Sequence, residues 1–276
     1  MTFARKTLIA GILVLFVLMA GAWLVRLTLK GAEAEEVIVL SGGSMKDVLS
    51  DAIGRYATIS RDRIMASYGE SADFAAQLTH GGKGDVFVCH DPFMPWAEEK
   101  GLISEWKTVA YLDNVIVVPK GNPAKIRQLS DLAKPGLRLG VGDRRYSTSG
   151  VVVNEMLARS PVGSSVASNI VVESKGHAVR CESVAQGHLD AAIVWNAVAF
   201  AMRDRVDIVG VDRTTVDAVT SATYKTTDLR NIRVTAGLVR QAATRESARK
   251  FYKYLTESCA DLFAAHGFRT EGVPIP

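Results

Sequence analysis

VIVLSGGSMKD, residues Val37–Asp47, joins a short β-branched apolar run to a turn that contains two glycines and two serines. The run Val37–Leu40 has the composition of a buried strand, and the residues from Met45 onward have the periodicity of a helix. The first N–H groups of a helix have no intrahelical acceptor, so the turn between them offers free donors. This stretch therefore predicts an α/β fold and directs attention to the starts of its helices.

The same alternation continues from residue 35 towards the C-terminus. It predicts a mainly parallel sheet with helices on both faces. The expected strands are 37–40, 64–68, 86–89, 115–119, 138–141, 170–173, 191–195 and 233–239. The expected helices are 45–56, 72–79, 94–100, 129–132, 150–159, 178–186, 197–203 and 246–266, the last ending at Gly267.

Two uncharged extended segments, Asn114–Val118 and Val234–Val239, bracket a region with its own strand and helix pattern. We therefore expect two α/β lobes connected by two crossover strands. Residues 35–114 and 240–276 would form lobe I, and residues 115–239, crossover strands included, would form lobe II. A cleft between lobes that are joined in this way is expected to open and close about a hinge.

The N-terminal segment has the pattern of an export signal. Nineteen uncharged residues, Thr7–Val25, follow Arg5 and Lys6, which is long enough to span a bilayer. Residues 1–34 are expected to be either a retained transmembrane anchor or a cleaved signal peptide, with Ala32–Ala34 as a small-x-small cleavage pattern. Both interpretations place the rest of the chain at the periplasmic or extracytoplasmic face, and a retained anchor would attach it to the cytoplasmic membrane.

Composition excludes several classes of protein. The 276 residues are 48% hydrophobic, enough for one large core or two smaller ones. The formal charge is +4, of which residues 1–34 supply three charges, so nothing indicates a nucleic-acid partner. No phosphate-binding loop of the G-x-x-x-x-G-K-[ST] type occurs, so the chain is not itself a transport ATPase.

Small polar residues precede four of the expected helices. They are Ser44, Ser71 in Gly69–Ala72, Ser149 in Tyr146–Gly150, and the turn Gly176–Val179. A helix N-terminus carries about half a positive charge and attracts anions. Two of these starts fall in each expected lobe, and in an open α/β sheet they lie at the edge where ligands bind. We therefore expect them to face one cleft and to hold a small oxyanion.

The order and spacing of several short motifs resemble those of the periplasmic molybdate-binding proteins of ABC importers, over residues 37 to about 268. These motifs are Ser41–Met45, Tyr68–Asp73, Gly84–Phe87, Val115–Pro119, Gly140–Asp143, Ala191–Trp195 and His266–Phe268. The resemblance implies a type II periplasmic binding protein fold, a monomer without catalytic activity, and an ABC permease as partner. It also implies molybdate or tungstate as the ligand, with no other cofactor.

Five positions match the family's ligand-binding residues. The resemblance assigns hydroxyl donors to Ser44 and Ser71, and backbone donors to Ser149 and Val179. Trp195 stands where the family has a tyrosine. These five residues would surround the metal of the oxyanion, although an indole N–H can donate a hydrogen bond but cannot accept one.

Other residues depart from the family pattern and leave the ligand open. The carboxylate of Glu70 would repel a dianion unless it points away or pairs with Arg180. Cys89 and His90 end an expected strand near the cleft, and Cys181 follows Val179 by two residues, so a softer ligand stays a second interpretation.

Two further functions stay open on the sequence alone. The same fold could serve as a membrane-tethered domain that senses a ligand. Gly69–Asp73 also resembles the G-x-S-x-G nucleophile elbow, but Asp73 replaces its second glycine, which weakens the case for a serine hydrolase that would use His177 or His188.

Overall fold

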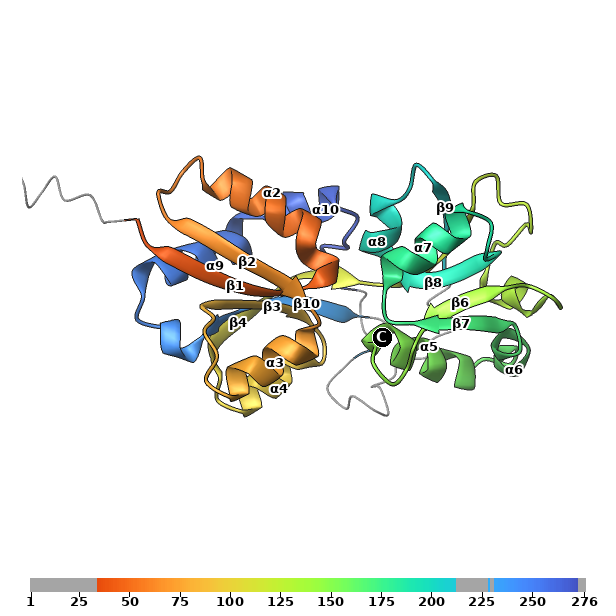
Figure 1. Cartoon of the computed structure of the whole chain (residues 1–276), viewed down its shortest axis with the longest axis horizontal. Helices are drawn as coiled ribbons and strands as arrows, with labels where there is room; N and C mark the ends of the chain where they lie inside the picture. Colours follow the sequence, from red (N-terminus) through yellow and green to blue (C-terminus); the bar gives the residue numbers. More distant parts are fainter. Residues whose placement is uncertain (1–33, 212–227, 229–230, 273–276) are drawn as a thin grey trace, which may run out of the picture. The chain divides into compact units, whose positions relative to one another are not determined.

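The computed structural model describes residues 34–211, 228 and 231–272. The expected anchor or signal peptide thus lies outside the described residues. Within the described part of the chain, no helix has both the length and the apolar character needed to cross a membrane. The described residues from Glu36 onward form one compact unit, which contains two five-stranded sheets (Figure 1).

The first sheet has the strand order β2-β1-β3-β10-β4. Strands β1 to β3 are parallel, whereas β10 runs antiparallel to both β3 and β4. Side chains alternate between the faces: Val37 and Val39 pack with α2 and α9, and Phe87 packs with α3 and α4. We call this sheet with its four helices and α10 the first lobe. Its strands are β1 (Glu36–Gly42), β2 (Arg63–Gly69), β3 (Val86–His90), β4 (Ile103–Leu112) and β10 (Ile232–Val239), and its helices are α2 (Lys46–Tyr56), α3 (Ser71–Thr79), α4 (Phe93–Glu99), α9 (Glu246–Ser258) and α10 (Ala260–Ala265).

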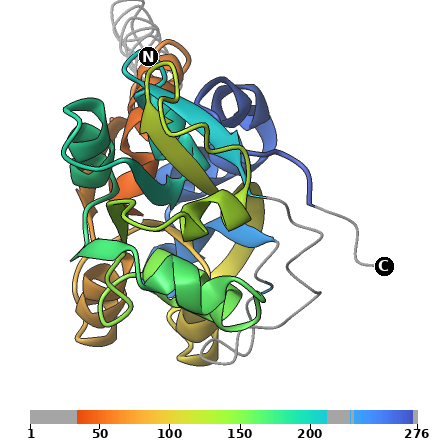
Figure 2. The same ribbon diagram turned by 90° about the vertical axis from the view of Figure 1, so that its right-hand side faces the viewer.

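The second sheet has the order β7-β6-β8-β5-β9. Ile116 and Val118 face the cluster that contains α5, and Val117 faces the cluster that contains α7. The two helices therefore cover opposite faces of the sheet, as Figure 2 shows from the side of this lobe. We call this sheet with its helices the second lobe. Its elements are β5 (Asn114–Pro119), β6 (Leu139–Gly142), α5 (Thr148–Ala158), α6 (Gly163–Ala167), β7 (Ile170–Ser174), α7 (His177–Ala185), β8 (Ala191–Trp195), α8 (Asn196–Ala201) and β9 (Val206–Gly210).

The structure refines the sequence-based expectations for the sheets, the crossover and the C-terminal helix. Both sheets are mixed, because β10 in the first and β5 in the second run against their neighbours, whereas the other four strands of each sheet run in one direction. Strand β10 lies wholly in the first sheet, so the chain returns from the second lobe before Ile232 and not within 234–239. The expected helix 246–266 is two helices separated at Cys259, and Gly267 follows with φ +79°, the predicted C-terminal stop.

Three short 3-10 helices complete the described elements. The first, η1, replaces the expected start of the helix at Met45 and sits directly between β1 and α2. The second covers all of the segment 129–132, which we expected to be a regular helix. They are η1 (Gly43–Met45), η2 (Leu129–Ala133) and η4 (Arg240–Ala242).

Candidate functional site

A pocket of about 1010 Å³ lies between the two lobes. The starts of η1 and α3 line it from the first lobe, and the starts of α5 and α7 line it from the second. The first N–H groups of these helices have no intrahelical acceptor and carry partial positive charge. The pocket is therefore built for a guest that accepts hydrogen bonds.

Ser71, at the first position of α3, brings a buried donor to the pocket. Only 4% of this residue is exposed, and its Oγ has no hydrogen-bond partner within the described structure. A buried hydroxyl without a partner costs about 1–3 kcal/mol, so such groups are rare and often functional. Gly42, at the end of β1, can approach this hydroxyl closely because it has no side chain; a Cβ there would lie 2.7 Å from the Ser71 Oγ.

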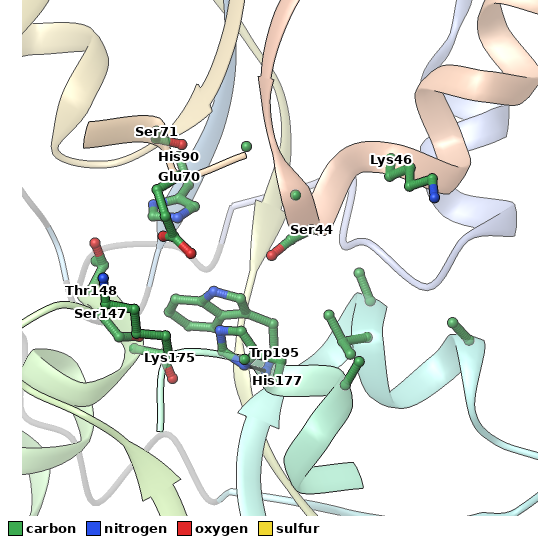
Figure 3. A pocket seen from close by; sticks show the side chains of 18 of the residues that line it. Ser44, Lys46, Glu70, Ser71, His90, Ser147, Thr148, Lys175, His177 and Trp195 are labelled. Atoms are coloured by element: carbon green, nitrogen blue, oxygen red, sulfur yellow. Dashed lines mark hydrogen bonds between the residues drawn. The ribbon is translucent and has the colours of Figure 1, made fainter. Parts of the chain in front are cut away.

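Ser44 and Ser149 contribute in different ways. Ser44 is half-buried in η1 and lines the pocket from the first lobe (Figure 3). Ser149 is fully buried, and its hydroxyl donates to Oδ1 of Asn114 at 2.9 Å. The Ser149 hydroxyl is thus already engaged, which leaves the backbone at the start of α5 as the group that faces the pocket.

Trp195 ends β8 and lies at the centre of the site. It is 1% exposed, and its ring stacks on that of His177, with centroids 5.6 Å apart and planes at 24°. His90 of the first lobe lies 6.0 Å from the same ring. Figure 3 shows the indole between His177 on one side and Glu70 and Ser44 on the other.

Val179 is placed differently from the other predicted site residues. It lies in the first turn of α7, but it is 63% exposed and is not among the residues that line the pocket. Gly176, His177 and Ala178 line the pocket instead. The predicted helix start is thus at the site, with the lining residues shifted towards the N-terminus.

Glu70 precedes α3 and lines the pocket with an exposed side chain. Its backbone carbonyl accepts from the N–H groups of Asp73 and Phe74, but within the described structure its carboxylate makes no hydrogen bond or ion pair. Arg180, one of the two alternatives considered for Glu70, is buried in the second lobe, where it bonds to the Ser174 carbonyl oxygen at 2.5 Å and to His177 at 3.0 Å. The two side chains are therefore not paired, and Glu70 stays an unneutralised carboxylate at the pocket.

His90 lines the pocket from the end of β3. Its Nδ1 lies 2.7 Å from the carbonyl oxygen of Asp91, which can only accept, so Nδ1 carries the proton. Burial lowers the pKa of His90 and so favours the neutral ring. The fully buried carboxylate of Asp91 fixes this end of the strand through hydrogen bonds of 2.9 and 2.8 Å from the Arg233 guanidinium.

The cysteines do not contribute to the pocket. Cys89 and Cys181 are fully buried in the hydrophobic clusters on one face of each sheet and do not line the pocket. Burial raises the pKa of both thiols, that of Cys181 to about 11, so neither is the thiolate that soft ligands require. Over the described ranges, no group of three or more His, Cys, Asp or Glu side chains could hold a metal ion.

Cationic side chains at the pocket were not predicted as site residues. Lys175 precedes the α7 turn, and its Nζ lies 4.5 Å from the centroid of the Tyr146 ring. The Arg145 guanidinium donates to Asp143 at 2.7 Å, and this bond lowers the pKa of Asp143 to about 2. The only sequence signal for these residues is their position beside the two helix-start motifs Tyr146–Gly150 and Gly176–Val179.

Comparison with known sequences identifies relatives of the chain. The family model for bacterial extracellular solute-binding proteins matches residues 37–269. A protein of Haemophilus influenzae with the general name of binding protein is 22% identical over 66% of this chain and 75% of its own length. The molybdate-binding protein ModA of Mycobacterium bovis is 27% identical over 64% of this chain and 67% of its own length.

Solved structures share the fold. The periplasmic molybdate-binding protein of Azotobacter vinelandii superposes with a TM-score of 0.68 at 16% identity, over 87% of this chain and all of the other. Peb3 of Campylobacter jejuni superposes with a TM-score of 0.65 at 21% identity, over 85% of this chain and all of the other. At these identities the likeness establishes the two-lobed architecture of type II periplasmic binding proteins, as expected from the sequence.

Proposed function

We propose that this chain, which belongs to the bacterial extracellular solute-binding protein family, binds a small tetrahedral oxyanion and delivers it to an ABC importer. The family implies a periplasmic or extracellular location. Its relatives and structural neighbours are binding proteins, and the chain is likewise a binding protein and not an enzyme.

One observation carries the proposal: the buried, unpartnered hydroxyl of Ser71 lies in a pocket lined by helix starts from both lobes. Neutral hydrogen-bond donors suit a fully deprotonated oxyanion, because such an anion can only accept hydrogen bonds. A hydrogen bond to a charged acceptor contributes about 1.5–3 kcal/mol. Several of them offset dehydration of the anion and leave about 8 kcal/mol, which corresponds to a micromolar Kd.

Molybdate and tungstate are the first ligands to test, and the ModA relatives support this choice. The proposed donors are the hydroxyls of Ser44 and Ser71, the backbone amides at Ser149 and Val179, and the indole N–H of Trp195. Since Ala178 lines the pocket and the Val179 side chain does not, the amide groups of this turn rather than its side chains would contact the anion.

We further propose an ABC permease as the partner that receives the anion from the closed form. Residues 1–34 would hold the chain at the membrane or direct its export, and the binding protein would act as a monomer. Because contacts from both lobes to one ligand favour the closed state, ligand occupancy and closure are coupled.

Isothermal titration calorimetry of the purified chain with molybdate, tungstate, sulfate and phosphate tests the proposal. We expect micromolar or tighter binding of molybdate and tungstate, accompanied by an increase in the thermal unfolding midpoint. The proposal is contradicted if none of the four anions binds or raises that midpoint.

A further inference from the structure

His177 has an unusual set of hydrogen-bond partners. Its Nδ1 lies 3.0 Å from Nη2 of Arg180 and 3.2 Å from the backbone N of Trp195. A guanidinium and a backbone N–H can only donate, so Nδ1 accepts both bonds and carries no proton. The proton of the neutral ring therefore resides on Nε2.

The orientation of the ring makes this proton available. The two nitrogens of an imidazole point to different sides of the ring, so Nε2–H is directed away from Arg180 and from the backbone of Trp195. His177 lines the pocket and stacks beneath the Trp195 ring, as Figure 3 shows. Protonation of Nδ1 would place a proton against two donors, and burial together with the Arg180 charge keeps the pKa of His177 well below its ordinary value.

Arg180 is a buried cation without a carboxylate partner. It is 0% exposed, and its guanidinium donates to the Ser174 carbonyl oxygen at 2.5 Å, to Oγ of Ser174 at 3.1 Å and to His177. Its Nε is buried without a partner in the described structure, where the side chain forms no ion pair. Burial lowers the pKa of Arg180 only to about 10, so the group is charged at neutral pH.

A buried charge without a counter-ion is costly. Here the polar partners of Arg180 are all neutral, and the one that connects it to the pocket is His177. An anion on the pocket side of this imidazole would lie in the field of the guanidinium. A doubly charged anion would gain more from that field than a singly charged anion of the same shape.

We propose that His177 is a ligand-binding residue whose Nε2–H donates to the oxyanion, and that Arg180 is a positioning residue that fixes this tautomer and favours a doubly charged ligand. This inference rests on the proposed oxyanion function of the same pocket. It adds a side-chain donor and a source of charge selectivity to the five predicted site residues.

The test compares two tetrahedral anions of nearly equal size and different charge, tungstate and perrhenate, by calorimetry. The variants are His177→Phe, which keeps an aromatic ring on Trp195 but has no N–H, and Arg180→Gln, which removes the charge. Two variants outside the pocket serve as matched controls: His188→Gln, an exposed residue, and Arg205→Gln, which pairs with Glu182 on the surface of the same lobe.

We expect His177→Phe to weaken tungstate binding by about 10- to 150-fold, the loss of one hydrogen bond to a charged acceptor. His177→Gln, which retains an N–H near the position of Nε2, should recover part of that loss. Arg180→Gln should lower the ratio of tungstate to perrhenate affinity by about fivefold or more. A purely structural role for Arg180 would lower thermal stability and leave this ratio unchanged, and both controls should match the wild type.

The outcomes separate the two proposals. If the wild type binds neither anion nor any other oxyanion, the proposed function fails and this inference fails with it. If the wild type binds tungstate, and the His177 and Arg180 variants keep both its affinity and its selectivity, only the inference fails. Nitrogen NMR of the wild-type protein determines the tautomer of His177 and does not depend on whether the variants fold. A His177 ring with the proton on Nδ1 would overturn the inference.

Discussion

At the scale of single residues, the serines at the helix starts have separate roles although they occupy equivalent places in the sequence. The Ser71 hydroxyl has no partner, whereas that of Ser149 is bonded to Asn114. The two alanine variants should therefore differ in which property they change.

Ser71→Ala should leave the stability of the ligand-free protein nearly unchanged or slightly increased, because it removes a buried hydroxyl that makes no bond. Molybdate affinity should fall by about 10- to 150-fold, the value of a hydrogen bond to a charged group. Thermal unfolding and calorimetry on the same sample measure both quantities. An unchanged affinity would remove Ser71 from the site.

Ser149→Ala should lower the free energy of unfolding by about 1 kcal/mol, because the bond to Asn114 is lost. The backbone N–H at this position is retained, so molybdate affinity should fall less than in Ser71→Ala. Chemical denaturation and calorimetry test this order. The reverse order of affinities would show that the hydroxyl of Ser149, and not its amide, binds the anion.

The buried Asp143 carboxylate, which pairs with the pocket residue Arg145, provides a pH-dependent prediction. Hydrogen bonds from the Arg145 side chain and backbone lower its pKa to about 2, below the ordinary 3.8. The stabilisation that this carboxylate contributes is therefore complete above about pH 4 and is lost as the pH falls towards 2. In Arg145→Gln the pKa measured by NMR titration should rise towards the ordinary value. Arg144→Gln is the control and should leave the pKa low, because Arg144 bonds to Asn154 instead.

At the scale of elements, the start of α5 is held by contact between two glycines. A Cβ on Gly150 would lie 2.4 Å from the Gly142 carbonyl oxygen and 2.7 Å from the Arg144 nitrogen, both backbone atoms. Gly150→Ala should therefore shift α5 away from β6, destabilise the protein by about 1–3 kcal/mol and weaken anion binding.

Gly54 supplies the matched control, because it lies inside α2 and a Cβ there would meet nothing within 4 Å. Gly54→Ala should stabilise the protein by about 0.5–1 kcal/mol through helix propensity. Denaturant unfolding of both variants checks the signs. A Gly150→Ala protein as stable as the wild type would mean that β6 and α5 do not require this close approach.

Comparison of the observed elements with the predicted ones shows which of them the sequence pattern could identify. Strand β8 was predictable from its unbroken apolar run Ala191–Trp195. The start of α7 was predictable from Gly176, which follows the β-branched run of β7. Strands β4 and β9 were not predicted. Glu105 and Lys107 interrupt the apolar pattern of β4, and Asp207 interrupts that of β9; both strands lie at sheet edges, where one side is open to solvent.

The same limit applies to the site. The sequence pattern located all four helix starts, and the serines named at three of them, Ser44, Ser71 and Ser149, line the pocket. At the fourth start, the backbone donor at Val179 stays a prediction. The residues of this turn that line the pocket are Gly176, His177 and Ala178, because the packing of Cys181 and Val184 sets the rotation of α7 against its sheet. The His177 tautomer depends on Arg180 and on the backbone of Trp195, a contact between α7 and β8 that a linear pattern does not contain.

At the scale of the whole molecule, the two lobes line the pocket with opposite charge. The first lobe contributes Asp47, Glu70 and Asp73 against Lys46, and the second contributes Arg145, Lys175 and Arg203. Opposite charges across a cleft attract, and the attraction is screened by salt. A bound anion and the acidic side chains of the first lobe would therefore compete for the same cationic side chains of the second lobe.

Glu70→Gln tests this competition, because Glu70 directly precedes the proposed donor Ser71. A carboxylate about 6 Å from a dianion opposes binding by about tenfold even in a water-like dielectric, and half as strongly in free energy for a monoanion. The variant should therefore bind tungstate about tenfold more tightly, with a smaller gain for perrhenate, and both gains should shrink as salt is added. Glu99→Gln, exposed on α4 outside the pocket, should bind both anions like the wild type.

The opposite result would have a definite meaning. Weaker tungstate binding by Glu70→Gln would show that this carboxylate stabilises the closed state more than it repels the ligand, with Lys175 and Arg145 as the available cations. In that case, small-angle scattering of the ligand-free variant should show a more open molecule than the wild type. If repulsion dominates, the ligand-free scattering of the variant and the wild type should coincide, and the two proteins should differ only in affinity.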